Sequence, residues 1–96
     1  MANFTFLKTI FKALGNERRL KILESIDRGI SNPGEIARSM KVSRSTIEKH
    51  IRVLRKAKII EKAPGLSSKG NLRIYYTMDG NIKRLLHKAL DIIKND

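Results

Sequence analysis

The side chains best suited to chemistry are the basic and hydroxyl groups that recur between residues 43 and 56. If this segment is a helix, Ile47, Ile51 and Leu54 fall within about 60° of one another and form its inward face. Lysine, arginine and hydroxyl groups occupy much of the rest, and such groups bind phosphates and base edges. The candidate DNA-binding residues of this segment are Ser43, Arg44, Ser45, Thr46, Glu48, Lys49, Arg52 and Lys56.

The positive charge of the chain is concentrated around the same segment. The 96 residues carry a formal net charge of +12. Residues 41–73 hold ten basic and two acidic residues, so this third of the chain has a net charge of +8. A localised cationic patch indicates a polyanionic partner, either nucleic acid or an acidic membrane surface. A membrane is the weaker candidate, because the most basic helix has no free apolar stripe for lipid.

Other kinds of chemistry lack the residues they need. The chain has no cysteine, which excludes disulfides, thiolate metal sites and cysteine nucleophiles. There is no glycine-rich phosphate loop, and we expect no enzyme activity, cofactor or small-molecule substrate. His87 and Asp91, four residues apart, could together ligate a metal across a dimer, but a single histidine on that helix favours no metal site. We expect His50 to pack or to hydrogen bond.

Apolar periodicity and capping residues predict five helices and one hairpin. The helices are expected over residues 3–14, between Asn16 and Gly29, from Pro33 to Met40, and over 44–57 and 80–94. The hairpin is expected to have a short strand at 59–62, a loop over 63–71 and a second strand over 72–77. The predicted fold class is mainly α with a small β-hairpin (α+β), in the order α-α-α-α-β-β-α, as one domain over residues 1–96.

The third and fourth helices are predicted to form a helix-turn-helix over residues 33–57. A short helix, a tight turn and a longer helix with a basic outer face are the parts of that motif. Ser43 can cap the fourth helix, whose first backbone amides can also bind phosphate. The hairpin over residues 59–77 is then a wing. Its candidate DNA-binding residues are Lys62, Lys69 and Arg73.

Four blocks of sequence stand in a specific order. They are ALGNERRLKIL at 13–23, GEIA at 34–37, SRSTIEKHIRVL at 43–54 and KAKII at 56–60. In residue type and spacing they resemble the ArsR/SmtB-type winged helix-turn-helix transcriptional regulators, and the resemblance spans about residues 11–77. It implies a dimeric regulator with its first and last helices at the dimer interface. Two positions depart from the pattern: Glu48 replaces a small hydroxyl residue, and Lys58 replaces a glycine.

The apolar arcs of the first and last helices support a dimer independently. Both the helix over 3–14 and the helix over 80–94 carry apolar residues over an arc broader than one contact surface needs. Each therefore requires a second apolar partner. The candidate interface residues are Phe4, Leu7, Ile10, Phe11, Ile82, Leu85, Leu86, Ala89 and Ile93.

These observations favour a homodimeric, sequence-specific regulator of transcription that binds double-stranded DNA in the cytoplasm. The expected activity is that of a repressor without a cysteine metal-sensing site. Sequence preference would depend chiefly on Ser45, Glu48 and Lys49, with Glu48 either accepting a hydrogen bond from cytosine or repelling phosphate. Two alternatives remain open: an architectural protein that coats DNA without sequence preference, and a protein-interaction module whose charge serves solubility.

Overall fold

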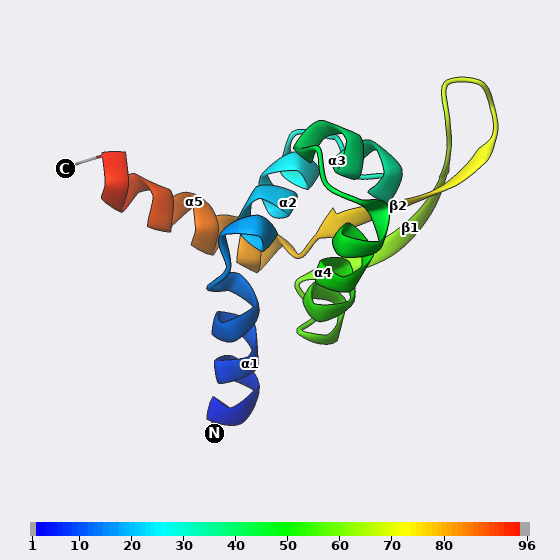
Figure 1. The fold of residues 1–96 in the computed structure, drawn as a ribbon. Helices are drawn as coiled ribbons and strands as arrows, with labels where there is room; N and C mark the ends of the chain where they lie inside the picture. Colours follow the sequence, from blue (N-terminus) through cyan, green and yellow to red (C-terminus); the bar gives the residue numbers. More distant parts are fainter. Residues whose placement is uncertain (1, 95–96) are drawn as a thin grey trace.

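Five helices and one antiparallel hairpin follow one another in the predicted order (Figure 1). The computed structural model describes residues 2–94. The elements are α1 (Phe4–Leu14), α2 (Glu17–Asp27), α3 (Pro33–Met40), α4 (Arg44–Lys56), β1 (Ile60–Leu66), β2 (Leu72–Met78) and α5 (Gly80–Lys94). The predicted fold class, mainly α with a small hairpin, is therefore confirmed.

Side-chain caps set the beginnings of the helices. Asn16 begins α2 by accepting a hydrogen bond from the amide of Arg19 at 3.0 Å. Asn32 begins α3 in the same way through the amide of Gly34, also at 3.0 Å. Because each cap satisfies an amide that has no partner inside the helix, it determines the residue at which the helix begins. The turn between α3 and α4 lies between the C-cap of α3 at Lys41 and the N-cap of α4 at Ser43, and it is therefore short.

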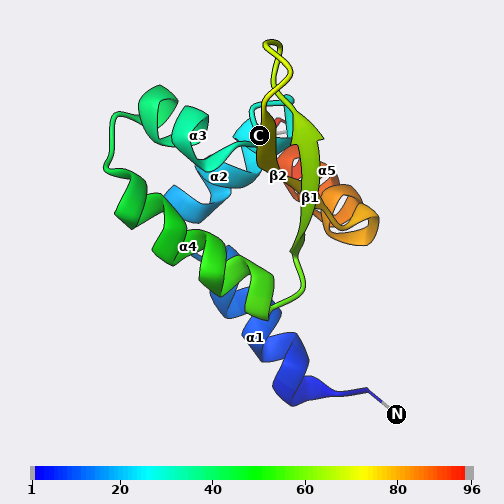
Figure 2. The ribbon, with the colours of Figure 1, turned by 90° about the vertical axis from the view of Figure 1, so that its right-hand side faces the viewer.

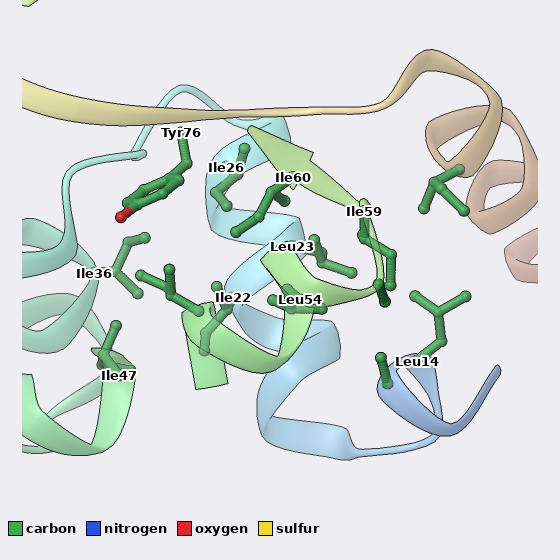
Figure 3. Packing of buried hydrophobic residues seen from close by; sticks show 14 of the residues in the cluster. Leu14, Ile22, Leu23, Ile26, Ile36, Ile47, Leu54, Ile59, Ile60 and Tyr76 are labelled. Atoms are coloured by element: carbon green, nitrogen blue, oxygen red, sulfur yellow. The ribbon is translucent and has the colours of Figure 1, made fainter. Parts of the chain in front are cut away.

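The core is formed mainly by aliphatic side chains from α2, α3, α4 and the base of the hairpin, together with Leu14 of α1 and Ile82 of α5 (Figure 3). Tyr76 on β2 is also buried. This shared core holds the helix-turn-helix against α2 and anchors the hairpin to both. The largest fully buried side chains are Ile22, Leu23, Ile36, Ile47, Leu54, Ile59 and Ile60.

The first strand of the hairpin is longer than predicted. Residues 63–66 were expected in a loop over 63–71, but β1 runs to Leu66 and pairs there with Leu72. Pro64 is tolerated because both strands of a two-stranded sheet are edges, so its missing N–H need not interrupt a ladder. Gly65 lies beneath the ring of Tyr75, where an added Cβ would come within 2.9 Å of a ring carbon. The prediction of a loop over residues 63–66 was therefore wrong.

The first and last helices extend from the core on the side away from the hairpin (Figure 1). After a quarter turn about the vertical axis, α3 and α4 lie together on the left and the tip of the hairpin projects beyond the helices (Figure 2). The fold thus separates two surfaces, one made by α1 and α5 and one made by the helix-turn-helix and the hairpin. Of the helices within residues 2–94, none combines the length and the apolarity needed to cross a bilayer.

Candidate nucleic-acid interface

A stripe of polar side chains runs along α4 directly opposite its buried face. Ile47, Ile51 and Leu54 point into the core. At 100° per residue, four other residues of α4 fall within about 60° of one another on the far side. All four are exposed, and three are cations. We call them the α4 stripe: Ser45, Lys49, Arg52 and Lys56.

Ser43 caps α4, as the sequence predicts. Its Oγ accepts a hydrogen bond from the amide of Thr46 at 3.2 Å. The same oxygen lies 2.8 Å from the hydroxyl of Thr46 and 3.2 Å from that of Ser45. The three hydroxyl groups therefore form a small exposed cluster at the first turn of the helix. Because its oxygen already has these partners, Ser43 acts first as a cap.

Glu48 lies beside the α4 stripe and has a local partner. Nε of Arg44 is 3.8 Å from a carboxylate oxygen of Glu48, and the two residues are four positions apart on the helix. Both side chains are largely exposed, so the pair contributes little to stability. The geometry places one negative charge between the cations of this helix, where Arg44 partly compensates it.

Arg38 on α3 was missed in the sequence. A Cβ added to Gly34 would lie 3.6 Å from Nη1 of Arg38 and 3.7 Å from Nη1 of Arg44. Two guanidinium groups therefore flank the first turn of α3, and Arg38 is exposed. Its position on the short helix of the predicted helix-turn-helix is the signal that the sequence offers, although the apolar spacing of α3 predicts only packing. Arg38 extends the cationic surface from α4 to α3.

The basic residues of the hairpin do not share one face. Residues paired across antiparallel strands point to the same side, and successive residues alternate. Lys62 pairs with the buried Tyr76 and so lies on the face that continues from the core. Arg73 pairs with Gly65 on the opposite face, and Lys69 stands in the turn between the strands. A flat surface cannot contact all three at once, whereas a groove around the hairpin can.

His50 links α4 to α2 and α1. Its Nδ1 lies 3.3 Å from Nη1 of Arg19, and Nε of Arg19 donates to the carbonyl of Ala13 at 2.6 Å. Burial and the nearby charges of Arg19 and Arg18 hold the pKa of His50 below its ordinary value. The neutral imidazole is the form of His50 that can accept a hydrogen bond from Arg19. The expectation that His50 packs or hydrogen bonds is confirmed.

His87 on α5 pairs with an acid on α2 and not with Asp91. Nε2 of His87 is 3.0 Å from Oδ2 of Asp27, and Nζ of Lys83 is 3.0 Å from Oδ1. The hydrogen bonds from His87 and Lys83 lower the pKa of Asp27. Across residues 2–94, the histidines and acids form no group of three or more that could hold a metal. His87 and Lys83 instead tie α5 to the end of α2.

Most apolar residues expected at a dimer interface are exposed on α1 and α5. Phe4 is 73% exposed and Ile93 is 68% exposed, while Ile10 and Leu86 pack partly against the core. Ile82 is a correction: it is buried in the core of its own chain and has little surface to offer to a partner. The remaining candidates are exposed, and they are Leu7, Phe11, Leu85 and Ala89. Sequence reasoning did not include two further exposed residues, Leu90 and Ile92.

Comparison with known proteins agrees with this geometry. The family model described as bacterial regulatory protein, arsR family, matches residues 16–62. The transcriptional repressor SdpR of Bacillus subtilis is 29% identical over 76 residues, which are 79% of this chain and 79% of that protein. The residues matched by the family model cover α2, the helix-turn-helix and the start of the hairpin.

Solved structures share the fold over nearly the whole chain. A homodimeric winged helix-turn-helix DNA-binding domain from Mycobacterium bovis has a TM-score of 0.75 and 22% identity, covering 96% of this chain and 81% of that one. HlyU from Vibrio cholerae has a TM-score of 0.70 and 22% identity, covering 98% of this chain and 97% of that one. The chain thus has the winged helix-turn-helix fold, and over residues 16–62 its sequence is similar to the arsR family of bacterial regulatory proteins.

Proposed function

We propose that the protein is a homodimeric repressor of transcription that binds double-stranded DNA with α4 in the major groove. The observation that carries the proposal is the α4 stripe, whose three cations stand opposite the buried face of that helix. The major groove admits one α-helix, and cations on the outward side of such a helix can reach both base edges and phosphates. Arg38 and Arg44 extend the contact to the backbone beside the groove.

The apolar faces of α1 and α5 support the dimer. Large apolar side chains on these helices, among them Phe4, Phe11 and Ile93, remain exposed in one chain. A second copy would remove them from water, and contiguous apolar surface of this kind marks an interaction site. A two-fold dimer places two α4 helices about 34–36 Å apart, one turn of duplex, which predicts a palindromic operator.

Sequence preference rests on the few side chains that reach base edges. Lys49 and Ser45 lie on the α4 stripe near the start of the helix, the part that enters deepest in a helix-turn-helix complex. Glu48 stands beside them with Arg44 as its ion-pair partner. In this arrangement Glu48 accepts a hydrogen bond from the N4 amino group of a cytosine, while Arg44 offsets the repulsion between the Glu48 carboxylate and the phosphates. The absence of cysteine leaves the protein without thiolate ligands for metal sensing.

Selection of bound sequences from random duplex DNA, followed by competition, tests this function. A regulator enriches a palindrome and binds it about 10³-fold or more tightly than random competitor. An architectural protein binds both alike. If the protein binds no duplex even at low salt, the helix-turn-helix has another role and the proposal fails.

A repressor whose operator overlaps the promoter blocks access of the polymerase to that promoter. Transcription in vitro from a template that carries the selected palindrome at the promoter should therefore fall as the protein is added. A template with a scrambled palindrome is the matched control. Transcription that rises on the first template would show an activator.

A further inference from the structure

The outer half of the hairpin carries an apolar face that nothing in the described chain covers. Leu66 pairs with Leu72 at the end of the strands, and Pro64 pairs with Ile74 one step closer to the core. All four lie on the same face as Tyr76, because cross-strand pairs alternate sides. Tyr76 is buried, but Leu66 is 69% exposed and Leu72 is 75% exposed. The face therefore leaves the core and continues into solvent along the end of the hairpin, whose backbone projects beyond the helices (Figure 2).

The surroundings of this apolar pair are purely cationic. Lys62, Lys69 and Arg73 are the charged residues between positions 62 and 78, and the segment contains no acidic residue. Two large exposed leucines therefore stand among positive charges on a projecting hairpin. The matching partner is a polyanion with an apolar recess between its rows of charge. The minor groove of DNA has this chemistry, since phosphates line its edges, deoxyribose rings form its walls and base edges form its floor.

The hairpin holds the two leucines in a fixed arrangement. The turn between them is closed by the amide of Ser67, which donates to the carbonyl of Asn71 at 2.8 Å, and by the amide of Gly70, which donates to the carbonyl of Ser67 at 2.8 Å. On the opposite face the ring of Tyr75 covers Gly65. These contacts order the tip before any partner arrives, which reduces the entropy lost on binding.

We propose that Leu66 and Leu72 form an apolar wedge that enters the minor groove of duplex DNA and bends it. This inference rests on the proposed function, in which α4 occupies the major groove and the adjoining groove is the minor one. Apolar side chains inserted there separate neighbouring base pairs and kink the duplex by about 20–90° toward the major groove. Lys62, Lys69 and Arg73 contact the phosphates on either side.

The wedge adds a form of specificity that base contacts on α4 do not supply. Pyrimidine–purine steps unstack most easily, so a wedge favours them at a fixed distance from each half-site. We expect TA or CA steps to be enriched in the flanks of selected sequences, at positions where α4 makes no contact. Replacing these steps by a stiff A-tract lowers the affinity of the wild-type protein and reduces the bend.

The test compares two double variants in the full-length protein. Leu66→Asn with Leu72→Asn removes the wedge, and Leu66→Met with Leu72→Met keeps it apolar. All four changes are at exposed positions, and circular dichroism checks that each variant is folded. Energy transfer between dyes at the two ends of a duplex reports bending, and fluorescence anisotropy of the same duplex reports binding. The duplex carries a TA step in each flank.

We expect the wild-type and Met proteins to bend the duplex by about 20° or more, and the Asn protein to bind it with the bend lost. An Asn protein that bends the duplex like wild type overturns the wedge, as does a wild-type protein that binds without bending. Absence of binding by all three refutes the proposed function as well, and anisotropy distinguishes that case. If only binding to anionic phospholipid vesicles is lost in the Asn protein, the tip contacts membranes and the wedge is wrong.

Discussion

Replacement of Lys49 and Arg52 by alanine should flatten the salt dependence of DNA binding. Both residues belong to the α4 stripe, are exposed, and stand opposite the buried face of the helix. Neither has an ion-pair partner among the described residues. Their charges are therefore free to neutralise phosphates, and removal of the two side chains should leave the core unchanged.

The magnitude follows from counting the charges. Each cation that neutralises a phosphate of B-form DNA contributes about 0.9 to the slope of log K against log salt concentration. The double variant removes two cations from each protomer, and the proposed dimer places both copies on one duplex. We therefore expect the slope to become shallower by about 3.6, from four lost contacts.

Fluorescence anisotropy over a series of potassium chloride concentrations measures this slope. A duplex of about 30 base pairs is long enough for two half-sites one turn apart with flanks. The matched control is Arg84→Ala with Lys88→Ala, which removes the same charge from α5. Both residues are exposed, and helical spacing places them away from the apolar side of that helix.

Two results would refute the reasoning. If the α5 control flattens the slope as much as the α4 variant does, net charge governs binding and α4 is not the contact surface. If the α4 variant weakens binding without changing the slope, Lys49 and Arg52 do not pair with phosphates. A slope change near half the expected value would indicate that one protomer binds alone.

Three further predictions concern stability, all measured by urea denaturation at one protein concentration. Leu54→Ala should lower the free energy of unfolding by about 2–5 kcal/mol, because Leu54 is fully buried and its loss leaves a cavity. An unchanged midpoint of urea denaturation would contradict this packing. Lys58→Gly should stabilise the fold by about 0.5–1 kcal/mol, because the backbone of Lys58 has a φ of 58°, a left-handed conformation that glycine adopts without strain. Lys58→Ala should show no such gain. The pKa of His50 is lowered in the folded chain, so the unfolded chain binds more protons as the pH falls below about 6.5. Stability should therefore decrease between about pH 7 and pH 5, and His50→Gln should be less sensitive over that range.

Local signals were sufficient for the helices and for the face of α4. Caps such as Asn16, Asn32 and Ser43 act within three residues, so the sequence contains everything that decides where those helices begin. The apolar spacing of α4 likewise determines which side is buried. The left-handed backbone at Lys58 also agrees with the sequence, since a glycine is usual there in the family that the chain resembles.

Features that depend on contacts distant in sequence were not predicted. The length of β1 depends on pairing with β2 and on Tyr75 covering Gly65, and composition alone indicated a loop. Arg38 becomes notable only because α3 and α4 bring it and Arg44 to either side of Gly34. Ile82 belongs to an apolar arc by its spacing, but only the packed core shows that its own chain covers it.

The attachment of α5 has a consequence for how such proteins diversify. The first half of α5 contacts its own chain through the buried Ile82, the half-buried Leu86, and the contacts of Lys83 and His87 with Asp27. The second half extends away with exposed apolar residues. A few side chains at this joint therefore set the angle of the whole helix and, in the proposed dimer, the spacing of the two α4 helices. In that dimer, substitutions at these contacts between α5 and the core would change the length of the operator without changing the residues that contact the bases.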